Sequence, residues 1–253
     1  MFVHNLNPVF LSIGPFEFRY YGLFYVVGLI MAYFLFTHLA RQRGIKITKD
    51  ETLDLVVYAG IGLMAGGRLF YFLFYNFGLV LQSPLELFKI WNGGMSFHGS
   101  LIGLIVAGII YCKIYKKNFF ELADLSVFPA AIALGIGRFG NFINGELFGR
   151  VTSVSWAVDF GDGLPRHPSQ LYEMVKNFAI FGILWSLRKK NVPTGFYFWL
   201  FVMLYGVFRF SIEFVREPDP QLGFVLFGLT MGQVLCSIMM LLGGFMLYKL
   251  LKK

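Results

Sequence analysis

The chain has 253 residues, of which 57% are hydrophobic and 14% are charged, and its formal net charge is +8. Soluble domains are usually about 45–50% apolar and about 25% charged, so a soluble fold of this length could not bury so much apolar surface. The composition excludes a disordered chain, a coiled coil, a disulfide scaffold and an ordinary cytosolic enzyme. It favours an all-α polytopic membrane protein with one domain, residues 1–253.

Residues 1–22 lack a basic segment and a small-residue cleavage site, so we expect a short interfacial lead-in rather than a cleaved signal peptide. Seven transmembrane helices are predicted after it. The third and fifth are shorter than the usual span of about 20 residues, but charged residues flank both. The predicted spans are Tyr21–Leu39, Leu53–Phe77, Ser96–Tyr111, Phe120–Ile136, Leu171–Leu187, Gly195–Phe214 and Phe224–Tyr248.

Two connections are long enough to carry structure of their own. Residues 78–94 contain Pro84 and the amphipathic stretch LELFKIW, which predicts a half-helix at the membrane interface. Residues 137–169 form the longest connection, which is polar, and within it a small extracytoplasmic head is expected at about residues 141–169. No internal repeat is visible, which argues against an inverted-repeat transporter.

Basic residues gather in the connections on one side of the predicted spans. By the positive-inside rule this side is cytoplasmic, so the N-terminus is predicted outside and the C-terminus in the cytoplasm. The same distribution explains the net charge without nucleic acid as a partner. The cytoplasmic clusters are Arg41, Arg43, Lys46 and Lys49; Lys113, Lys116 and Lys117; Arg188, Lys189 and Lys190; and Lys249, Lys252 and Lys253.

Ionisable residues inside spans cost about 3 kcal/mol each and mark function by default. Arg68 and Arg209 lie about 22 Å and about 21 Å along their predicted helices from the cytoplasmic edge. Asp124 is an exception near the cytoplasmic boundary. The other polar residues share the outer half of the bilayer, as a site at the outer leaflet requires, and include Tyr21, His98, Arg138, Glu173 and Lys176.

Arg209, Glu213 and Arg216 have a spacing that places them on one helix face. One interpretation is a structural ladder of ion pairs, in which Glu213 neutralises an arginine. The other is that Arg68, Arg138 and Arg209 form a cationic layer with few carboxylates, which favours an anion. Arginine suits phosphate because its planar fork donates paired hydrogen bonds, and the anion at hand is a phospholipid headgroup.

Two glycine-rich stretches are the densest motifs. In GRFGNFINGELFGR, residues 137–150, glycines allow close backbone approach to a ligand, and a continuing helix would place Arg138, Asn141 and Asn144 on one face. A helix end with capping residues is the structural alternative. In WNGGMSFHGS, residues 91–100, His98 begins an outer helix beside glycines. A lone histidine is usually structural, but this position favours a functional role.

These motifs closely resemble those of the phosphatidylglycerol–prolipoprotein diacylglyceryl transferases. The resemblance covers nearly the whole chain in order, through RYYG at residues 19–22, GGMSFHGSLIG, GRFGNFINGELFGR, RHPSQLYE and YGVFRFSIEFVREPD at residues 205–219. Arg19 and Phe148 depart from the family pattern and leave the specificity of the head open.

The resemblance implies an enzyme of the bacterial inner membrane whose site faces the outer leaflet. It would transfer a diacylglyceryl group from phosphatidylglycerol to the lipobox cysteine thiol of a prolipoprotein signal peptide and release glycerol phosphate. Neither a metal nor another cofactor is expected.

The implied chemistry assigns a role to each candidate residue. Arg138 and Arg209 would stabilise the departing phosphate, and His98 would be the general base for the thiol. A cationic site also lowers a thiol pKa unaided, so a dedicated base is not required. The predicted substrate-binding residues are Tyr21, Arg68, Asn141, Asn144, Glu146, Gly149, Tyr205, Glu213 and Arg216.

Other classes of protein fit less well. A transporter or channel would need polar groups near the midplane or on both sides, whereas here they stop at the outer half. In an intramembrane serine protease His98 and Ser100 would have to face each other, but two residues apart on a helix they do not. A metal hydrolase is disfavoured because the histidines are scattered and no HExxH motif occurs.

Overall fold

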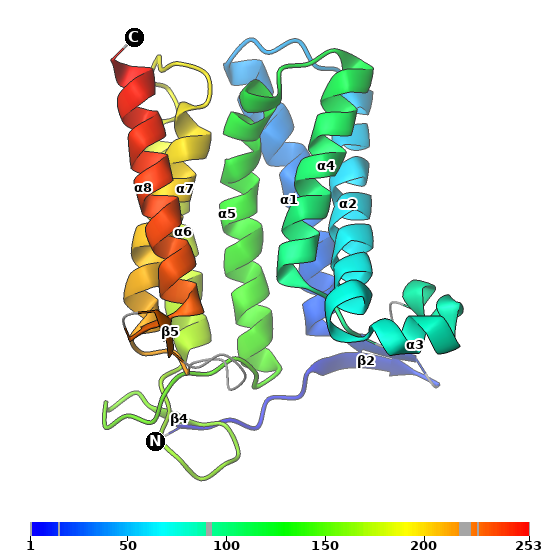
Figure 1. Cartoon of the computed structure of the whole chain (residues 1–253), viewed down its shortest axis with the longest axis vertical. Helices are drawn as coiled ribbons and strands as arrows, with labels where there is room; N and C mark the ends of the chain where they lie inside the picture. The colour runs from blue at the N-terminus through cyan, green and yellow to red at the C-terminus, as the bar shows by residue number, and fades with distance from the viewer. Residues whose placement is uncertain (1, 15, 90–92, 218–223, 227, 253) are drawn as a thin grey trace. The chain divides into compact units, whose positions relative to one another are not determined.

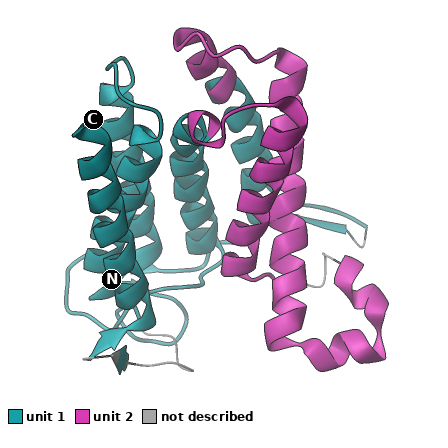
Figure 2. Cartoon of the chain, turned by 45° about the horizontal axis from the view of Figure 1, so that its top comes forward, with its two compact units in different colours: residues 1–35, 123–253 teal, residues 36–122 magenta. Residues whose placement is uncertain are grey.

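The computed structural model describes residues 2–14, 16–89, 93–217, 224–226 and 228–252. The chain packs as two compact units, shown in Figure 2: unit 1 comprises residues 1–35 and 123–253, and unit 2 comprises residues 36–122. The helices are α1 (Tyr20–Gln42), α2 (Lys49–Tyr75), α3 (Phe77–Gln82), the 3-10 helix η1 (Pro84–Phe88), α4 (Phe97–Tyr115), α5 (Phe119–Ile143), α6 (Ser169–Leu187), α7 (Phe196–Glu213) and α8 (Met231–Leu251).

Short strands pair in three places within unit 1. β1 (Phe2–Val3) is parallel to β4 (Val158–Asp159), β2 (Val9–Ile13) is antiparallel to β3 (Phe16–Arg19), and β5 (Phe224–Leu226) is antiparallel to β6 (Leu229–Thr230). The predicted lead-in is therefore largely a β-hairpin that continues directly into α1. Its cross-strand pairs alternate between an apolar face, with Leu11 opposite Phe18, and a polar face, with Ser12 opposite Glu17.

Every predicted span contains a helix, and within the described residues six helices are long and apolar enough to cross a membrane: α1, α2, α4, α5, α7 and α8. The helix of the fifth predicted span, α6, is not among these six and carries the buried polar residues Gln170, Glu173, Lys176 and Asn177. Large apolar side chains stand outward on the spans; Leu241 of α8, for example, is 75% exposed. Such surfaces suit contact with lipid, where backbone groups must be satisfied within helices.

Three predicted boundaries are wrong. The fourth span does not end at Ile136, because α5 continues through the glycines to Ile143 and stops before Gly145, whose φ is +67°. The last span does not begin at Phe224, since Thr230 and Gln233 form a capping box that starts α8 at Met231. The predicted half-helix is instead α3 followed by η1, because Pro84 lacks an N–H and restricts the residue before it.

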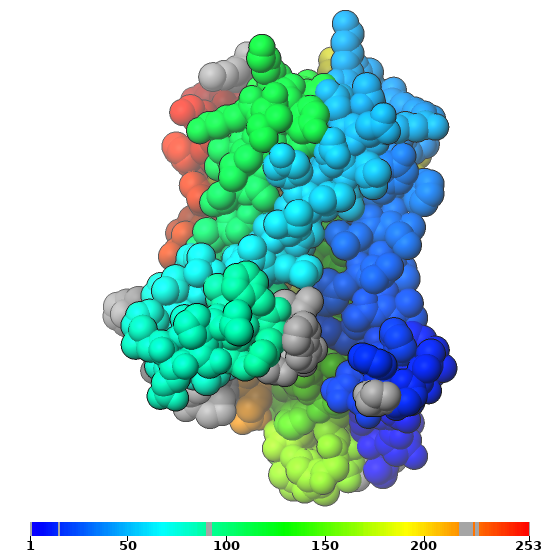
Figure 3. Space-filling view, turned by 90° about the vertical axis from the view of Figure 1, so that its right-hand side faces the viewer, coloured from blue at the N-terminus to red at the C-terminus, as the bar shows by residue number. Residues whose placement is uncertain are grey.

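In unit 2, α2 packs closely along α4. A Cβ on Gly62, Gly66, Gly99 or Gly103 would collide with backbone atoms of the opposite helix. This seam of small residues lets the two backbones touch, as in many membrane helix pairs. At the far end of α2 the segment of α3 and η1 bulges outward (Figure 3).

In unit 1, α7 lies beside α8 and also packs on α6 (Figure 1). Asp124 of α5 explains the single charge predicted near the cytoplasmic boundary. Its Oδ2 accepts a hydrogen bond of 2.7 Å from the Gly195 amide, and its Oδ1 accepts one of 2.8 Å from the Phe198 amide. These amides belong to the first turn of α7, where backbone N–H groups have no hydrogen-bond partner within the helix. Asp124 satisfies these donors, and the positive end of the helix dipole stabilises its negative charge.

Candidate functional site

A buried carboxylate, Glu173, is the centre of a charged cluster in unit 1. Its Oε2 lies 2.7 Å from Lys176 Nζ and 3.7 Å from Arg138 Nε, and its Oε1 lies 3.0 Å from Arg209 Nε. Helices α5, α6 and α7 therefore each bring a cation to one carboxyl group that is fully buried. Burying a lone carboxylate costs on the order of several kcal/mol, and these three cations offset that cost.

Glu213 extends the cluster from α7 to α8. Its Oε2 pairs with Arg209 Nη1, and its Oε1 accepts a hydrogen bond of 2.8 Å from Thr230 Oγ1. A Cβ on Gly232 would lie 2.6 Å from Glu213 Oε1, so the glycine leaves room for the Glu213 carboxylate beside the first turn of α8. The ladder predicted for α7 is thus present between Arg209 and Glu213, and Thr230 holds it in place.

The four cations in this cluster are not equally engaged by carboxylates. Lys176 and Arg209 each lie within 3.0 Å of a carboxylate oxygen, whereas the ion pair of Arg138 is long, at 3.7 Å. Arg216 lies within electrostatic range of Arg138 and Arg209, and among the described residues its guanidinium has no ion pair or hydrogen bond. The cluster therefore has four cations for two carboxylates, which favours an anion at Arg138 and Arg216.

The turn after α5 joins three predicted site residues. Asn141 Nδ2 donates to Glu146 Oε1 over 2.8 Å, and Asn144 Nδ2 donates to the same oxygen over 3.1 Å. Asn144 lies just after the last residue of α5, where its amide still donates to Gly140 O over 2.9 Å, and both side-chain amides turn to Glu146. The Oδ1 of Asn144 is buried without a hydrogen-bond partner among the described residues, which leaves it an acceptor for a ligand.

Tyr21 and Tyr25 approach this turn from α1. Their hydroxyl groups are 3.2 Å apart, and Tyr25 lies within electrostatic range of Arg138 and Glu146. A Cβ on Gly140 would lie 2.8 Å from the Tyr21 ring, so this glycine lets α5 approach α1 closely. Tyr25 was missed by the sequence analysis, although it stands one helical turn after Tyr21 and so shares its face.

Gly149 ties the head to the end of α7. Its amide donates to His167 O over 2.8 Å, and it forms a bridge with Arg216. A Cβ there would collide with Val215 O. The neighbouring Arg150 donates from its backbone to Val215 O and from Nε to Arg216 O, both within 2.9 Å. Only glycine allows the strand contact that positions Arg216, and a role of Gly149 in substrate binding stays a prediction.

The head is secured by its own ion pairs. Arg166 Nε donates to Asp162 Oδ2 over 2.6 Å, and Arg166 Nη1 reaches Glu217 Oε2 over 3.2 Å. The hydrogen bond from Arg166 holds the pKa of Asp162 below its usual value. Partial burial lowers the pKa of His167, whose Nδ1 lies 3.1 Å from Tyr172 Oη.

Arg68 and His98, the other two candidates, belong to unit 2. Arg68 is buried, and its guanidinium donates five hydrogen bonds to backbone carbonyls of the segment after α2: those of Glu86, Leu87, Lys89, Gly93 and Gly94. These bonds use all five of its N–H groups. They also explain why that segment is not a regular helix, because its carbonyls face the arginine. To bind substrate, Arg68 would have to release some of these bonds.

His98 lies in the first turn of α4. Ser96 caps this helix by accepting a hydrogen bond of 3.3 Å from the Gly99 amide. The imidazole is exposed and contacts the neighbouring Phe97 ring edge to face. It is therefore accessible to a ligand.

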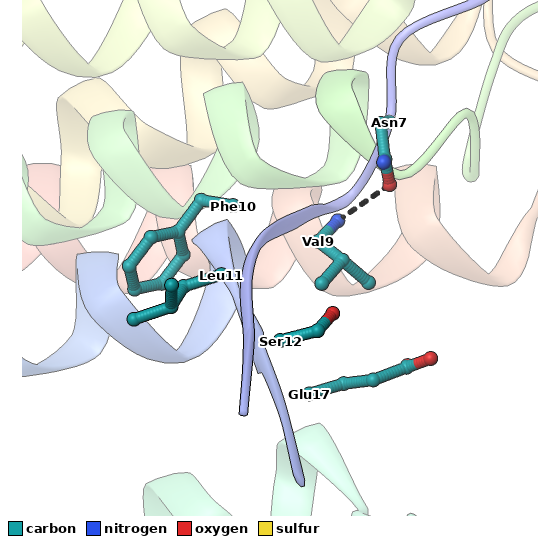
Figure 4. A pocket seen from close by; sticks show the side chains of 6 residues that line it. All are labelled: Asn7, Val9, Phe10, Leu11, Ser12 and Glu17. Atoms are coloured by element: carbon teal, nitrogen blue, oxygen red, sulfur yellow. Dashed lines mark hydrogen bonds between the residues drawn. The ribbon is translucent and has the colours of Figure 1, made fainter. Parts of the chain in front are cut away.

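A hollow of about 360 Å³ lies on the hairpin, lined by Asn7, Val9, Phe10, Leu11, Ser12 and Glu17 (Figure 4). It is open to solvent, and none of the predicted site residues lines it. The charged cluster, with its convergent cations and unsatisfied acceptor, is therefore the stronger candidate. The sequence analysis recognised Glu173 and Lys176 as charges of the outer half but did not assign them to the site. The available signal was a pair of opposite charges three positions apart within an apolar run.

Comparisons with known proteins identify the family of this chain. Residues 8–249 match the family described as prolipoprotein diacylglyceryl transferase. A phosphatidylglycerol–prolipoprotein diacylglyceryl transferase of Geobacter sulfurreducens is 49% identical over 242 residues, covering 94% of this chain and 93% of the relative. The same-named protein of Vibrio vulnificus is 49% identical, covering 95% and 89%, and that of Coxiella burnetii is 45% identical, covering 98% and 97%. This chain is a multi-pass membrane protein and belongs to the prolipoprotein diacylglyceryl transferase family.

Proposed function

We propose that this protein transfers a diacylglyceryl group from phosphatidylglycerol to the lipobox cysteine thiol in the signal peptide of a prolipoprotein. This is the first step of bacterial lipoprotein maturation. The observation that carries the proposal is the cluster around Glu173, in which Arg138 and Arg216 have N–H donors available for a phosphate. The relatives named for this activity match the chain over nearly its whole length.

The reaction forms one bond and breaks one. The cysteine sulfur attacks the glyceryl carbon that carries the phosphate, forming a thioether. The C–O bond breaks, and its electron pair leaves with the oxygen as glycerol phosphate. The thiol proton must depart, because the thiolate is the nucleophile. Negative charge therefore grows on the phosphate oxygens, and cations placed in advance lower the barrier.

Arg138, Arg209 and Arg216 supply that charge in the proposal. Arg138 and Arg216 bind the phosphate directly through their unused N–H groups, and Arg209 contributes from its fixed position between Glu173 and Glu213. The unsatisfied Oδ1 of Asn144 accepts a hydrogen bond from a headgroup hydroxyl. Asn141, Glu146 and Gly149 hold this binding surface together, and the Tyr21 hydroxyl adds a donor.

His98 takes the thiol proton in the proposal. A neutral imidazole nitrogen can accept a proton, and this imidazole is exposed at the start of a helix. The alternative is that the cations alone lower the thiol pKa enough for attack. The apolar spans provide surface for the two acyl chains and for the signal-peptide helix.

Incubation of the purified protein with phosphatidylglycerol and a lipobox peptide tests the activity. Mass spectrometry should show the peptide carrying a diacylglyceryl thioether, together with free glycerol phosphate. A peptide with serine in place of the lipobox cysteine is the control and should remain unmodified. If the cysteine peptide also remained unmodified, the proposed function would be wrong. Uptake of a solute into proteoliposomes, with no thioether formed, would favour the transporter instead.

The proposed location is the cytoplasmic (inner) membrane, with the N-terminus outside, the C-terminus in the cytoplasm and the active site toward the outer leaflet. The four basic clusters support it. Single cysteines placed at Asp162 and at Lys190 should be labelled from opposite sides of the membrane. Labelling of both from the same side would contradict this orientation.

A further inference from the structure

Lys176 is a buried cation that none of the predicted roles uses. It lies on α6 with 3% of its surface exposed, and its Nζ is 2.7 Å from Glu173 Oε2. The same Nζ lies 3.7 Å from the centre of the Tyr205 ring, a cation–π contact that holds the ammonium group from α7. A lysine that is this buried costs free energy unless its charge is matched, so its position is closely determined.

Lys176 and Arg138 share one oxygen. Both approach Glu173 Oε2, the lysine at 2.7 Å and Arg138 Nε at 3.7 Å, while Arg209 takes Oε1. A carboxylate and a guanidinium otherwise close into a two-bonded fork, which would use the donors that a phosphate needs. The ammonium group on Oε2 keeps Arg138 at the longer distance, with 19% of its side chain exposed.

We propose that Lys176 is a positioning residue for the phosphate of the lipid substrate: it occupies Glu173 so that Arg138 stays available to the headgroup. This inference rests on the proposed function and deepens it. Without the ammonium group, Oε2 is buried away from water, and Arg138 is the other cation that approaches it. Arg138 would then pair firmly with Glu173 and bind phosphate more weakly.

The variant Lys176→Met removes the ammonium group and keeps an unbranched apolar side chain. We expect its kcat/KM for phosphatidylglycerol to fall by at least about tenfold, through a higher KM and a lower kcat, because Arg138 is withdrawn both from the bound headgroup and from the charge that develops on its phosphate. Lys176→Arg keeps a cation on Glu173, and its KM should remain near that of the natural protein. Equal effects of the Met and Arg variants would overturn the proposal, as would a loss confined to kcat.

The double variant Lys176→Met/Glu173→Gln separates positioning from a merely structural role. Removing the carboxylate charge removes the group that would capture Arg138, so KM should return to within about threefold of the natural value. If Lys176 only stabilised the fold, the single and double variants would change the melting temperature while the KM of the folded protein stayed at the natural value. The double variant leaves no buried charge at residues 173 and 176, so it also serves as the test if the single Met variant does not fold.

A binding measurement makes failure of this inference distinguishable from failure of the proposed function. Calorimetric titration with glycerol phosphate needs no turnover. Its affinity should fall about tenfold in Lys176→Met and recover in the double variant. If the natural protein showed no transferase activity, the proposed function would be wrong, and this titration would still test Lys176. Unchanged affinity in Lys176→Met would overturn the positioning role alone.

Discussion

The helices inside each of the two units of this protein are held together in different ways. In unit 2, α2 and α4 meet largely through glycines, backbone against backbone. In unit 1, α5, α6 and α7 meet through buried ions around Glu173. A glycine seam offers nothing for a ligand to bind or displace, whereas an ion cluster with more cations than carboxylates does. The difference indicates which contacts serve only stability.

Arg68 and Arg138 show the same contrast in one residue type. Both were predicted from their depth in the membrane, but Arg68 gives all five N–H groups to backbone carbonyls. Arg138 has a single long ion pair among the described residues. An arginine whose donors are used orders a loop, and one whose donors are unused can bind a substrate.

The largest effect is expected at Arg138. Arg138→Ala should abolish measurable transfer, and Arg138→Lys should remain severely impaired, since it keeps the charge but loses the planar fork. Losing one prepared donor to a developing anion typically costs about 3–4 kcal/mol. Initial rates at matched protein levels measure the loss, with Arg41→Lys at the exposed end of α1 as control. Near-normal turnover in Arg138→Lys would exclude the phosphate role.

The second largest effect is expected at His98. If it is the base, His98→Gln should lower turnover by about 100-fold, and raising the pH until the peptide thiol ionises should restore much of it. If the cations act alone, His98→Gln should be mild at every pH. Rate profiles of both proteins decide the matter, and more than half of the natural activity at pH 7 in the Gln variant would remove the base assignment.

A substitution in the seam should affect stability rather than chemistry. In Gly103→Ala the new Cβ would meet Gly66 Cα at 2.9 Å, and overpacking of this kind costs about 1–3 kcal/mol. The melting temperature in detergent should fall, while the KM of the remaining folded enzyme stays unchanged. Gly182→Ala is the control, because no atom lies within 4 Å of its added Cβ. Equal melting temperatures would show that the seam tolerates expansion.

The smallest effect concerns pH. Burial lowers the folded-state pKa of His167 below its ordinary value of 6.5, so the folded protein binds fewer protons than the unfolded chain. Its contribution to stability is complete above that value and declines as the pH falls through it. The melting temperature should therefore drop slightly between pH 7.5 and 5.5 on this account. His167→Gln should lessen the drop, and an unchanged drop would assign it elsewhere.

Helix positions could be predicted from sequence because apolar runs of this length have one physical interpretation. Boundaries were less predictable, since a capping box at Thr230 and a proline at residue 84 act over a few residues. The arginines of the site were found by depth and motif. Their partners were not, because depth along separate helices does not say which faces meet. The ion pairs of Glu173 and Lys176 can be identified only when the packing of α6 against its neighbouring helices is known.

The hydrogen bond between Gly195 and Asp124 helps to determine how far along their helices Arg138 and Arg209 lie. It joins α5 to the start of α7 through Gly195, and from this shared origin Arg138 follows Asp124 by 14 residues while Arg209 follows Gly195 by 14 residues. At about 1.5 Å per residue both guanidinium groups are carried about 21 Å along their helices, to equal heights. Glu173 can therefore receive both. Inserting one residue into either helix would raise its arginine by about 1.5 Å and turn it by about 100°, whereas lengthening the loop before Gly195 would leave both levels intact.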